Sequence, residues 1–258
     1  MKAIVSAENK ASRADRSAVS LVFAPGARPD VSAIGALAAR NGKFSVSFAP
    51  DEISSGENHW VELLANGLTF DVTGLKPGPA RGQPERAHLF GLPEGPEFAA
   101  CEAITITPGS HLAGGRTMLP VLRNLALLGA LFAELPQVFA VAWHPARAWS
   151  EPGYFRSAIL RWIAGGPFPG LGLTAIAPTS EGGLKSEGLE IFTGQELVLS
   201  PDLVRDGAEG AKVAVRLVNW LAESGMLTES TSMMGHSGET LHLVPQQNQQ
   251  IVKVTQSS

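Results

Sequence analysis

Apolar positions recur along the chain with two different spacings, and the spacing changes from one short block to the next. The first third predicts a strand, a helix, a second strand and a hairpin, over Ala18–Phe23, Val31–Arg40, Lys43–Ala49 and Trp60–Val72. Asp30 is a residue type that caps helix N-termini, and Asn66-Gly67 is a strong signal for a tight hairpin turn. This part of the chain therefore predicts mixed helix and strand.

The second part of the chain is more regular. Strands are predicted over Ala103–Thr107, Val138–Trp143, Leu171–Ala177, Glu187–Phe192, Glu196–Leu199, Leu241–Val244 and Ile251–Val254. Three helices are expected to begin after Thr117, Ser150 and Asp206, each of which is a residue type that caps helices. Glu209 completes a capping box with Asp206, and Gly225 ends the last helix. The continuous apolar run Val138–Trp143 is typical of a central, buried strand.

These elements predict an α+β fold, with a central mixed sheet and helices packed on it. Between the two parts lies the Pro/Gly-rich stretch 74–98, which is either an ordered excursion or a linker. We therefore expect a flexible N-terminus at 1–17, an N-terminal α+β half at 18–98 and a C-terminal α+β half at 99–258, packed as one compact unit. Pro25-Gly26 and Pro108-Gly109 stand at matching places in two strand–loop–helix–strand segments, so two similar halves are one possibility.

Charge and cysteine content narrow the function classes. The chain of 258 residues has a formal net charge of −4 and no cluster of Lys and Arg, which argues against nucleic-acid binding. Cys101 is the only cysteine, so neither an internal disulfide nor a cysteine-based zinc cluster can form. The first residues lack the apolar segment of a signal peptide, and the most apolar stretch is interrupted by polar residues. We expect a soluble, cytoplasmic protein that does not enter a membrane.

The C-terminal third resembles a known bacterial family. The resemblance is carried by Gly170-Leu171-Gly172-Leu173-Thr174, by Gly188–Leu197 with its sequence GLEIFTGQEL, and by Val218-Asn219-Trp220-Leu221 in the last helix. Together these segments resemble the family catalogued as domain of unknown function 4261, over roughly 169–254. The resemblance implies an α+β fold and a bacterial source. It implies no activity, cofactor or catalytic residue.

One glycine-rich stretch is a candidate anion site. Pro108–Thr117 leads from a predicted strand into a predicted helix, where exposed N–H groups and Arg116 would favour an anion. The stretch is not a P-loop, because Gly115 and Arg116 stand where that motif needs Lys and then Ser or Thr. A tight connection without a ligand is the alternative.

A second stretch, Trp143–Ser150, is expected to open at the same edge of the sheet as the first. His144, Arg147 and Trp149 follow the strand Val138–Trp143, and a strand–helix–strand crossover gives parallel strands whose loops open at the same sheet edge. We therefore predict a crevice lined by His111, Arg116, His144, Arg147 and Trp149. Histidine could perform acid–base chemistry there, or each histidine could simply bond the nearby backbone.

The remaining candidates are weaker. Ser110 and His111 are sequence neighbours, which is poor geometry for a nucleophile and its base. Glu187, Glu190 and Glu196 are expected on outward, solvated strand faces, and Cys101 as a small core residue. We predict no catalytic residue, no metal site and no cofactor.

Three functions remain open. The first is a non-enzymatic binding or interaction protein, of a stress, immunity or regulatory type, that uses a sheet edge or the surface around Trp149 to bind a protein. The second is a small-molecule or anion-binding protein, possibly an enzyme, that uses the predicted crevice. The third is a homo-oligomeric structural module, suggested by five tryptophans beside a single tyrosine.

Overall fold

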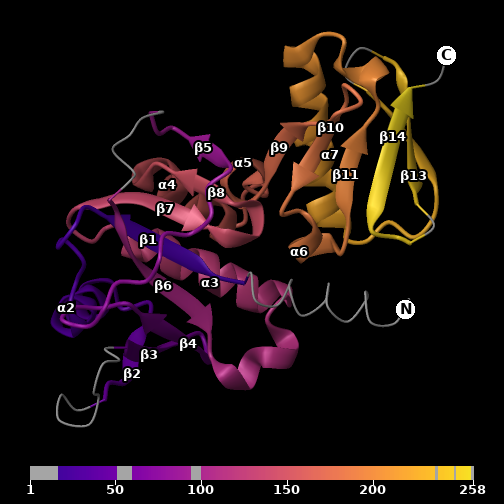
Figure 1. The fold of residues 1–258 in the computed structure, drawn as a ribbon. Helices are drawn as coiled ribbons and strands as arrows, with labels where there is room; N and C mark the ends of the chain where they lie inside the picture. The colour runs from indigo at the N-terminus through magenta and orange to yellow at the C-terminus, as the bar shows by residue number, and fades with distance from the viewer. Residues whose placement is uncertain (1–16, 51–59, 94–99, 236–237, 247, 257–258) are drawn as a thin grey trace, which may run out of the picture. The chain divides into compact units, whose positions relative to one another are not determined.

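The chain forms two compact units, Met1–Gly165 and Gly166–Ser258 (Figure 1). The computed structural model describes residues 17–50, 60–93, 100–235, 238–246 and 248–256. Of the N-terminal segment predicted to be flexible, residues 1–16 lie outside this description. Both units combine helices with a mixed sheet, so the predicted α+β class is confirmed.

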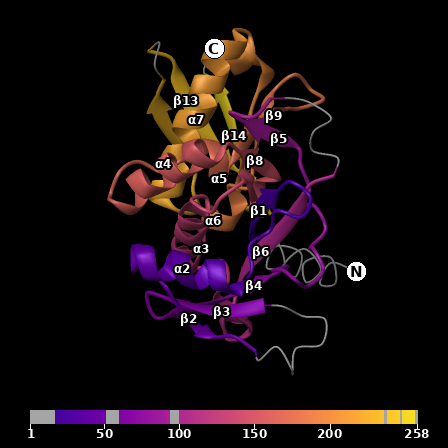
Figure 2. The ribbon, with the colours of Figure 1, turned by 90° about the vertical axis from the view of Figure 1, so that its left-hand side faces the viewer.

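The first unit, unit 1, is built on an eight-stranded sheet in the order β2-β3-β4-β6-β1-β7-β8-β5. Its strands are β1 Val19–Phe23, β2 Ser45–Phe48, β3 Trp60–Ala65, β4 Leu68–Thr73, β5 His88–Phe90, β6 Glu102–Pro108, β7 Val138–Trp143 and β8 Ala148–Ser150. Its helical segments are α2 Val31–Asn41, η2 Ser110–Gly115, α3 Leu119–Phe132, η3 His144–Ala146 and α4 Pro152–Ile163. Figure 2 shows α2 and α3 on the same side of this sheet.

Strand β1 lies in the middle of the sheet, between β6 and β7, and is antiparallel to both. β6 and β7 are therefore parallel to each other, as the strand–helix–strand pattern predicts, but they are separated by β1. Both of the strand–loop–helix–strand segments that begin at Pro25-Gly26 and Pro108-Gly109 belong to this one sheet. The sequence echo therefore does not mark two halves lying side by side.

The two faces of the sheet are covered differently. Val19 points toward α3, where a Cβ added at Gly129 would lie 2.9 Å from Val19 Cγ2. Val22 points to the opposite face because side chains alternate along a strand. There it packs in a small cluster with Ala140, Ala142 and Trp149, against Leu89, Leu92, Cys101 and Phe139.

The Pro/Gly-rich stretch is an ordered excursion over its described part, 74–93, and not a linker. Its backbone bonds to β6 from Arg81 N to Ala103 O at 3.2 Å, and to the residue before β8 from Ala87 N to Arg147 O at 2.8 Å. β5 then pairs in parallel with β8. Residues on both sides of the excursion share one sheet, so the division predicted near residue 98 is wrong. The boundary between the units falls at Gly165 and Gly166 instead.

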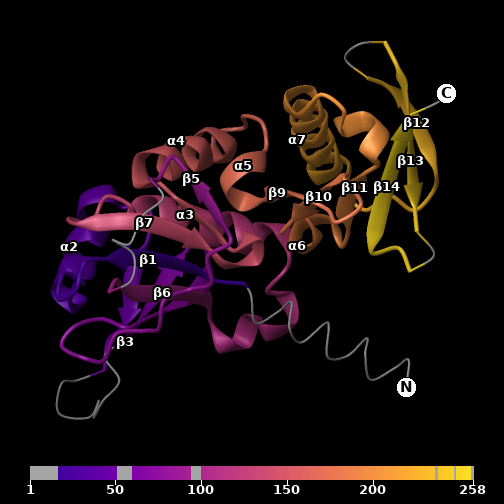
Figure 3. The ribbon, with the colours of Figure 1, turned by 45° about the horizontal axis from the view of Figure 1, so that its top comes forward.

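The second unit, unit 2, has a six-stranded sheet in the order β12-β13-β14-β11-β10-β9. Its strands are β9 Ala175–Pro178, β10 Leu184–Glu187, β11 Glu196–Leu199, β12 Thr231–Met234, β13 Thr240–Pro245 and β14 Ile251–Gln256. Its helical segments are α5 Gly170–Leu173, α6 Glu190–Thr193, η4 Pro201–Val204 and α7 Gly207–Ser224. The last three strands lie next to one another in Figure 3, and β11 joins them by parallel pairing with β14.

Several predicted elements differ in detail. The strand expected at Glu187–Phe192 is interrupted because Gly188 has a φ of 85°, and the chain then turns into α6. The strand expected at Leu171–Ala177 is shortened to β9 because α5 takes its first residues. Thr117 and Ser150 are not the helix caps: α3 is preceded by Met118 without a side-chain cap, and Glu151 caps α4.

Helix α7 follows its prediction closely. The Asp206 carboxylate accepts hydrogen bonds from Ala208 N and Glu209 N, and Gly225 stands at the other end. Val218 and Leu221 are buried as expected, whereas Val215 is only half-buried. Over the described residues, no helix combines the length and hydropathy needed to cross a bilayer.

Candidate functional site

The two loops of the predicted crevice lie at the same end of the unit 1 sheet. η2 follows β6 and carries His111, while η3 follows β7 and contains His144. Because β1 lies between those strands, the loops start about two strand spacings, or roughly 10 Å, apart. The partners of each side chain therefore decide whether one crevice exists.

His144 is turned onto the sheet and not toward a ligand. Its Nε2 lies 2.8 Å from Ser20 Oγ, which in turn lies 2.8 Å from Thr105 Oγ1. Burial lowers the pKa of His144 to about 4, so the ring is neutral at pH 7. Although a Ser–His pair can form a nucleophile and base, Ser20 is fully buried within β1 and has no access for a substrate. The row Thr105–Ser20–His144 thus satisfies partly buried polar groups across β6, β1 and η3.

His111 and Arg116 belong to a different group of side chains. His111 is exposed, and its Nε2 lies 2.9 Å from Thr69 Oγ1 on β4, which is on the side of β6 away from β7. Burial and the negative charge of Glu62 raise the pKa of Asp71, while the charges of His111 and Arg116 act in the opposite direction. Within the described residues, the Nε atom of Arg116 is buried without a hydrogen-bond partner.

Arg147 and Trp149 contact the excursion. Arg147 Nη1 donates to Glu85 Oε1 at 2.7 Å. Trp149 is only 1% exposed, and Arg86 Cζ lies 5.3 Å from the centre of its ring. The five predicted site residues therefore fall into three groups with separate partners, and the Trp149 side chain itself is buried.

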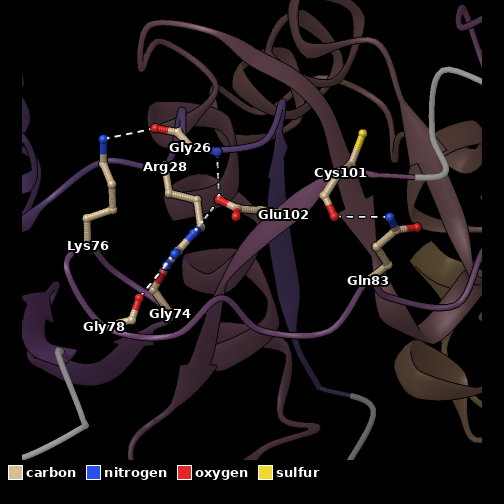
Figure 4. A network of polar contacts seen from close by, with 8 residues as sticks. All are labelled: Gly26, Arg28, Gly74, Lys76, Gly78, Gln83, Cys101 and Glu102. Carbon is tan, nitrogen blue, oxygen red and sulfur yellow. Dashed lines mark hydrogen bonds and ion pairs between the residues drawn. The ribbon is translucent and has the colours of Figure 1, made fainter.

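A buried charged network centred on Arg28 stabilises the fold of unit 1 (Figure 4). Arg28 is 7% exposed, and its Nε donates to Glu102 Oε2 at 2.8 Å. Its two terminal nitrogens donate to the carbonyl oxygens of Gly74 and Gly78. Glu102 also accepts from Gly26 N at 3.1 Å. Each polar group has its partner, so the network fixes the start of the excursion and offers nothing to a ligand.

An exposed apolar patch at one edge of the unit 1 sheet was missed from the sequence. We call it the edge patch and define it as Phe48, Trp60 and Leu64. Phe48 is 51% exposed and Leu64 is 41% exposed, and the rings of Phe48 and Trp60 lie 5.6 Å apart. Trp60 and Leu64 alternate along β3 with the buried Val61 and Leu63, and Phe48 pairs with Glu62 on the same face.

The edge patch lies beside a free sheet edge. β2 is the end strand of the sheet, and no described strand pairs with its outer side. Two carboxylates lie on the same face as the patch: Glu62 stands between Trp60 and Leu64 along β3 and pairs directly with Asp71 on β4. The signal in the sequence was the alternation of Trp60, Glu62 and Leu64, in which large apolar residues occupy the positions of a strand's outer face.

Unit 2 contains one buried carboxylate that was expected in solvent. Glu196 accepts hydrogen bonds from Ser186 Oγ, from Gly188 N at 2.8 Å and from Glu190 N at 3.3 Å. Burial raises its pKa to about 7, although these three donors favour the charged form. The contacts hold the bend between β10 and α6. Sequence reasoning missed this role because the bend lies within the segment predicted as a continuous strand.

In the described residues, no group of three or more His, Cys, Asp or Glu side chains is placed to hold a metal ion.

Comparison with known proteins adds no relative. No protein-family model, no curated protein and no solved structure matches the chain. The resemblance of the C-terminal third to domain of unknown function 4261 therefore stays a prediction.

Proposed function

We propose that this protein is a non-enzymatic interaction protein that binds an extended segment of a partner protein at the β2 edge of unit 1. The observation that carries the proposal is the edge patch: two large apolar side chains more than 40% exposed, at a strand whose outer side pairs with no described strand. Large exposed apolar residues clustered on one surface mark interaction sites more often than isolated ones do.

Strand addition explains why the patch and the edge occur together. The outer side of β2 presents backbone N–H and C=O groups that an extended segment can pair with. The side chains of such a segment would alternate, so every second one would lie on the face that carries Phe48, Trp60 and Leu64. Backbone pairing would then supply affinity, and the edge patch would select apolar residues.

The charges near the patch define the partner further. Glu62 and Asp71 lie next to each other on the same face as the edge patch. Their carboxylates would attract a segment that carries Lys or Arg among its alternating apolar residues. We therefore infer that the partner segment is extended, apolar at alternate positions and basic.

Anion binding is the second candidate and has less support. It rests on Arg116, whose Nε lacks a partner among the described residues. The other four residues of the predicted crevice all have partners in the structure. One half-buried arginine on a short loop specifies a ligand less well than a patch combined with a free edge.

Selection from a library of displayed peptides would test the proposed function. We expect extended, basic peptides to be enriched on the native protein. The double substitution Phe48→Ser, Leu64→Ser should weaken their binding at least about tenfold, because the edge patch would be lost. Fluorescence anisotropy with labelled peptides measures the change.

Two controls make the test specific. Tyr154 on α4 is 39% exposed and lies on a different element, so Tyr154→Ser should bind the peptides like the native protein. Methylating alternate backbone nitrogens of a bound peptide should abolish binding, since strand pairing needs those N–H groups. No enriched peptide, or equal binding by the double variant, would refute the proposed function.

A further inference from the structure

A groove in unit 2 lies between α7 and the strands β12 and β13, and it has a volume of about 160 Å³. Its floor is formed by Val213 and Leu217 from the helix and by Met233 and Leu241 from the strands. All four side chains are apolar. The site belongs to unit 2 and is independent of the edge patch in unit 1.

The size of the groove limits what it can hold. Apolar cavities of about 150 Å³ bind benzene in other proteins. A single six-membered ring, or an aliphatic group of the same bulk, therefore fits the floor. A longer chain or a fused ring system would extend beyond it into solvent.

The rim of the groove carries one cation without an ionic partner. Lys212 Nζ donates to Glu209 Oε1 at 2.6 Å, so these two charges compensate each other. Arg216 Nη2 donates only to the backbone oxygen of Met234, at 3.3 Å, and has no ion pair in the part of the chain that the structure describes. Its guanidinium therefore keeps donors for an oxygen ligand at the mouth of the groove.

We propose that this groove is a binding site for a compact apolar monocarboxylate. The apolar group lies on Val213, Leu217, Met233 and Leu241, and the carboxylate is bound by Arg216. Burial of the ring supplies affinity, and the arginine selects an acid over a neutral or cationic molecule of the same shape.

Titration with three probes that share a benzyl group tests the proposal. Phenylacetate is the expected ligand, benzyl alcohol is its neutral analogue, and benzylamine is its cationic analogue. For a ligand of this size we expect a Kd of about 1 mM for phenylacetate. Benzyl alcohol and benzylamine should bind at least about fivefold more weakly, since neither can form the charged bond to Arg216. Amide chemical shifts in NMR spectra report both the affinity and the residues affected.

Two substitutions separate the apolar and the ionic contribution. Val213→Phe fills the groove and should abolish binding of all three probes. Arg216→Met should weaken phenylacetate about tenfold and leave benzyl alcohol unchanged, because only the charged bond is lost. Arg205→Met is the matched control: Arg205 is an exposed arginine of unit 2 outside the groove, and its loss should change nothing. If Val213→Phe does not fold, the Arg216 and Arg205 variants still decide the result.

Several outcomes would overturn the proposal. These are no binding at about ten times the expected Kd, shifts outside the groove, or equal affinity for the acid and its neutral analogue. Tighter binding of benzylamine would show that Glu209, not Arg216, dominates the rim. A dimer that Val213→Phe dissociates, seen by sedimentation, would assign the groove to a second copy of the chain.

Discussion

Arg28 shows at the residue scale how a charge is buried without becoming a functional group. It lies between β1 and α2, but its partners Glu102, Gly74 and Gly78 belong to segments far along the chain. A buried charge is stable only when its donors are satisfied. Here all three groups that Arg28 contacts are acceptors, so the side chain joins the loop before α2 to the excursion.

Removing Arg28 should destabilise unit 1 strongly. Arg28→Met leaves two buried carbonyls without their donor and Glu102 without its cationic partner, so we expect a loss of about 3 kcal/mol in the free energy of unfolding. Urea unfolding followed by tryptophan fluorescence measures it. The exposed Arg205→Met should change stability by less than about 0.5 kcal/mol. Equal losses of unfolding free energy in the two variants would mean that the hydrogen bonds of Arg28 do not stabilise the protein.

The contacts of single side chains were the hardest feature to predict from the sequence. His144 was expected to line a crevice, but its ring bonds Ser20, which lies 124 positions away and which no local pattern indicates. Glu196 was expected in solvent because a strand of that composition has an outer face. The glycine at 188 turns the chain back, and its backbone N–H then meets the carboxylate. Such partners are set by tertiary packing.

Elements were predicted best where the signal is local. Asp30 caps α2, Asp206 caps α7, and Asn66-Gly67 forms the turn between β3 and β4. Those signals depend on residues within four positions of each other. The caps of α3 and α4 were placed one residue too early, because Met118 and Glu151 lead those helices instead of Thr117 and Ser150.

Two helix glycines give a test at the scale of elements. Gly35 in α2 has nothing within 4 Å of an added Cβ, whereas a Cβ at Gly129 in α3 would lie 2.9 Å from Val19 Cγ2 on β1. Gly35→Ala should stabilise the protein by about 0.5–1 kcal/mol, since alanine is the better helix former. Gly129→Ala should destabilise it by about 1–3 kcal/mol, since α3 must move off the sheet.

Thermal or urea unfolding of both glycine variants shows whether each substitution stabilises or destabilises the protein. Helix propensity alone predicts stabilisation for both, so opposite signs would demonstrate that α3 packs against β1 at Gly129. Stabilisation of both variants would contradict that packing.

At the scale of the whole molecule, the fold class was predictable but the division of the chain was not. The predicted boundary at the Pro/Gly-rich stretch relied on composition, which cannot distinguish a linker from an excursion that covers a sheet. The pairing of β4 with β6 across that stretch shows that the residues before and after it belong to one sheet. Pairing between distant strands leaves no local trace in a single sequence, so the boundary at Gly165 and Gly166 was missed.

The two units should respond to pH in opposite directions. The pKa of His144 in unit 1 is lowered from 6.5 to about 4, so its contribution to stability is present above pH 6.5 and is lost as the pH falls through 4. The pKa of Glu196 in unit 2 is raised from 4.5 to about 7, so its contribution is present below pH 4.5 and is lost as the pH rises through 7. Each of the two shifts in pKa changes the free energy of unfolding by roughly 3 kcal/mol.

Hydrogen exchange read by mass spectrometry measures the two units separately. Peptides from unit 1 should lose protection toward pH 4, and peptides from unit 2 should lose it above pH 7, after correction for intrinsic exchange rates. His144→Gln should flatten the first trend only, and Glu196→Gln the second only. Parallel trends in both units, or trends that persist in these variants, would contradict the assignment.

The central place of β1 has a consequence for synthesis. This strand is made first, yet its partner β7 is completed only when Trp143 has been added, and Ser20 and His144 are 124 residues apart. At about 5–20 residues per second, the β-prone segment VSLVF waits roughly 6–25 s for its second neighbour. During that interval on the ribosome it is an apolar strand with at least one unpaired edge, of the kind that aggregates. The protein's yield in a cell would therefore depend on how well chaperones shield its N-terminal region until translation passes residue 143.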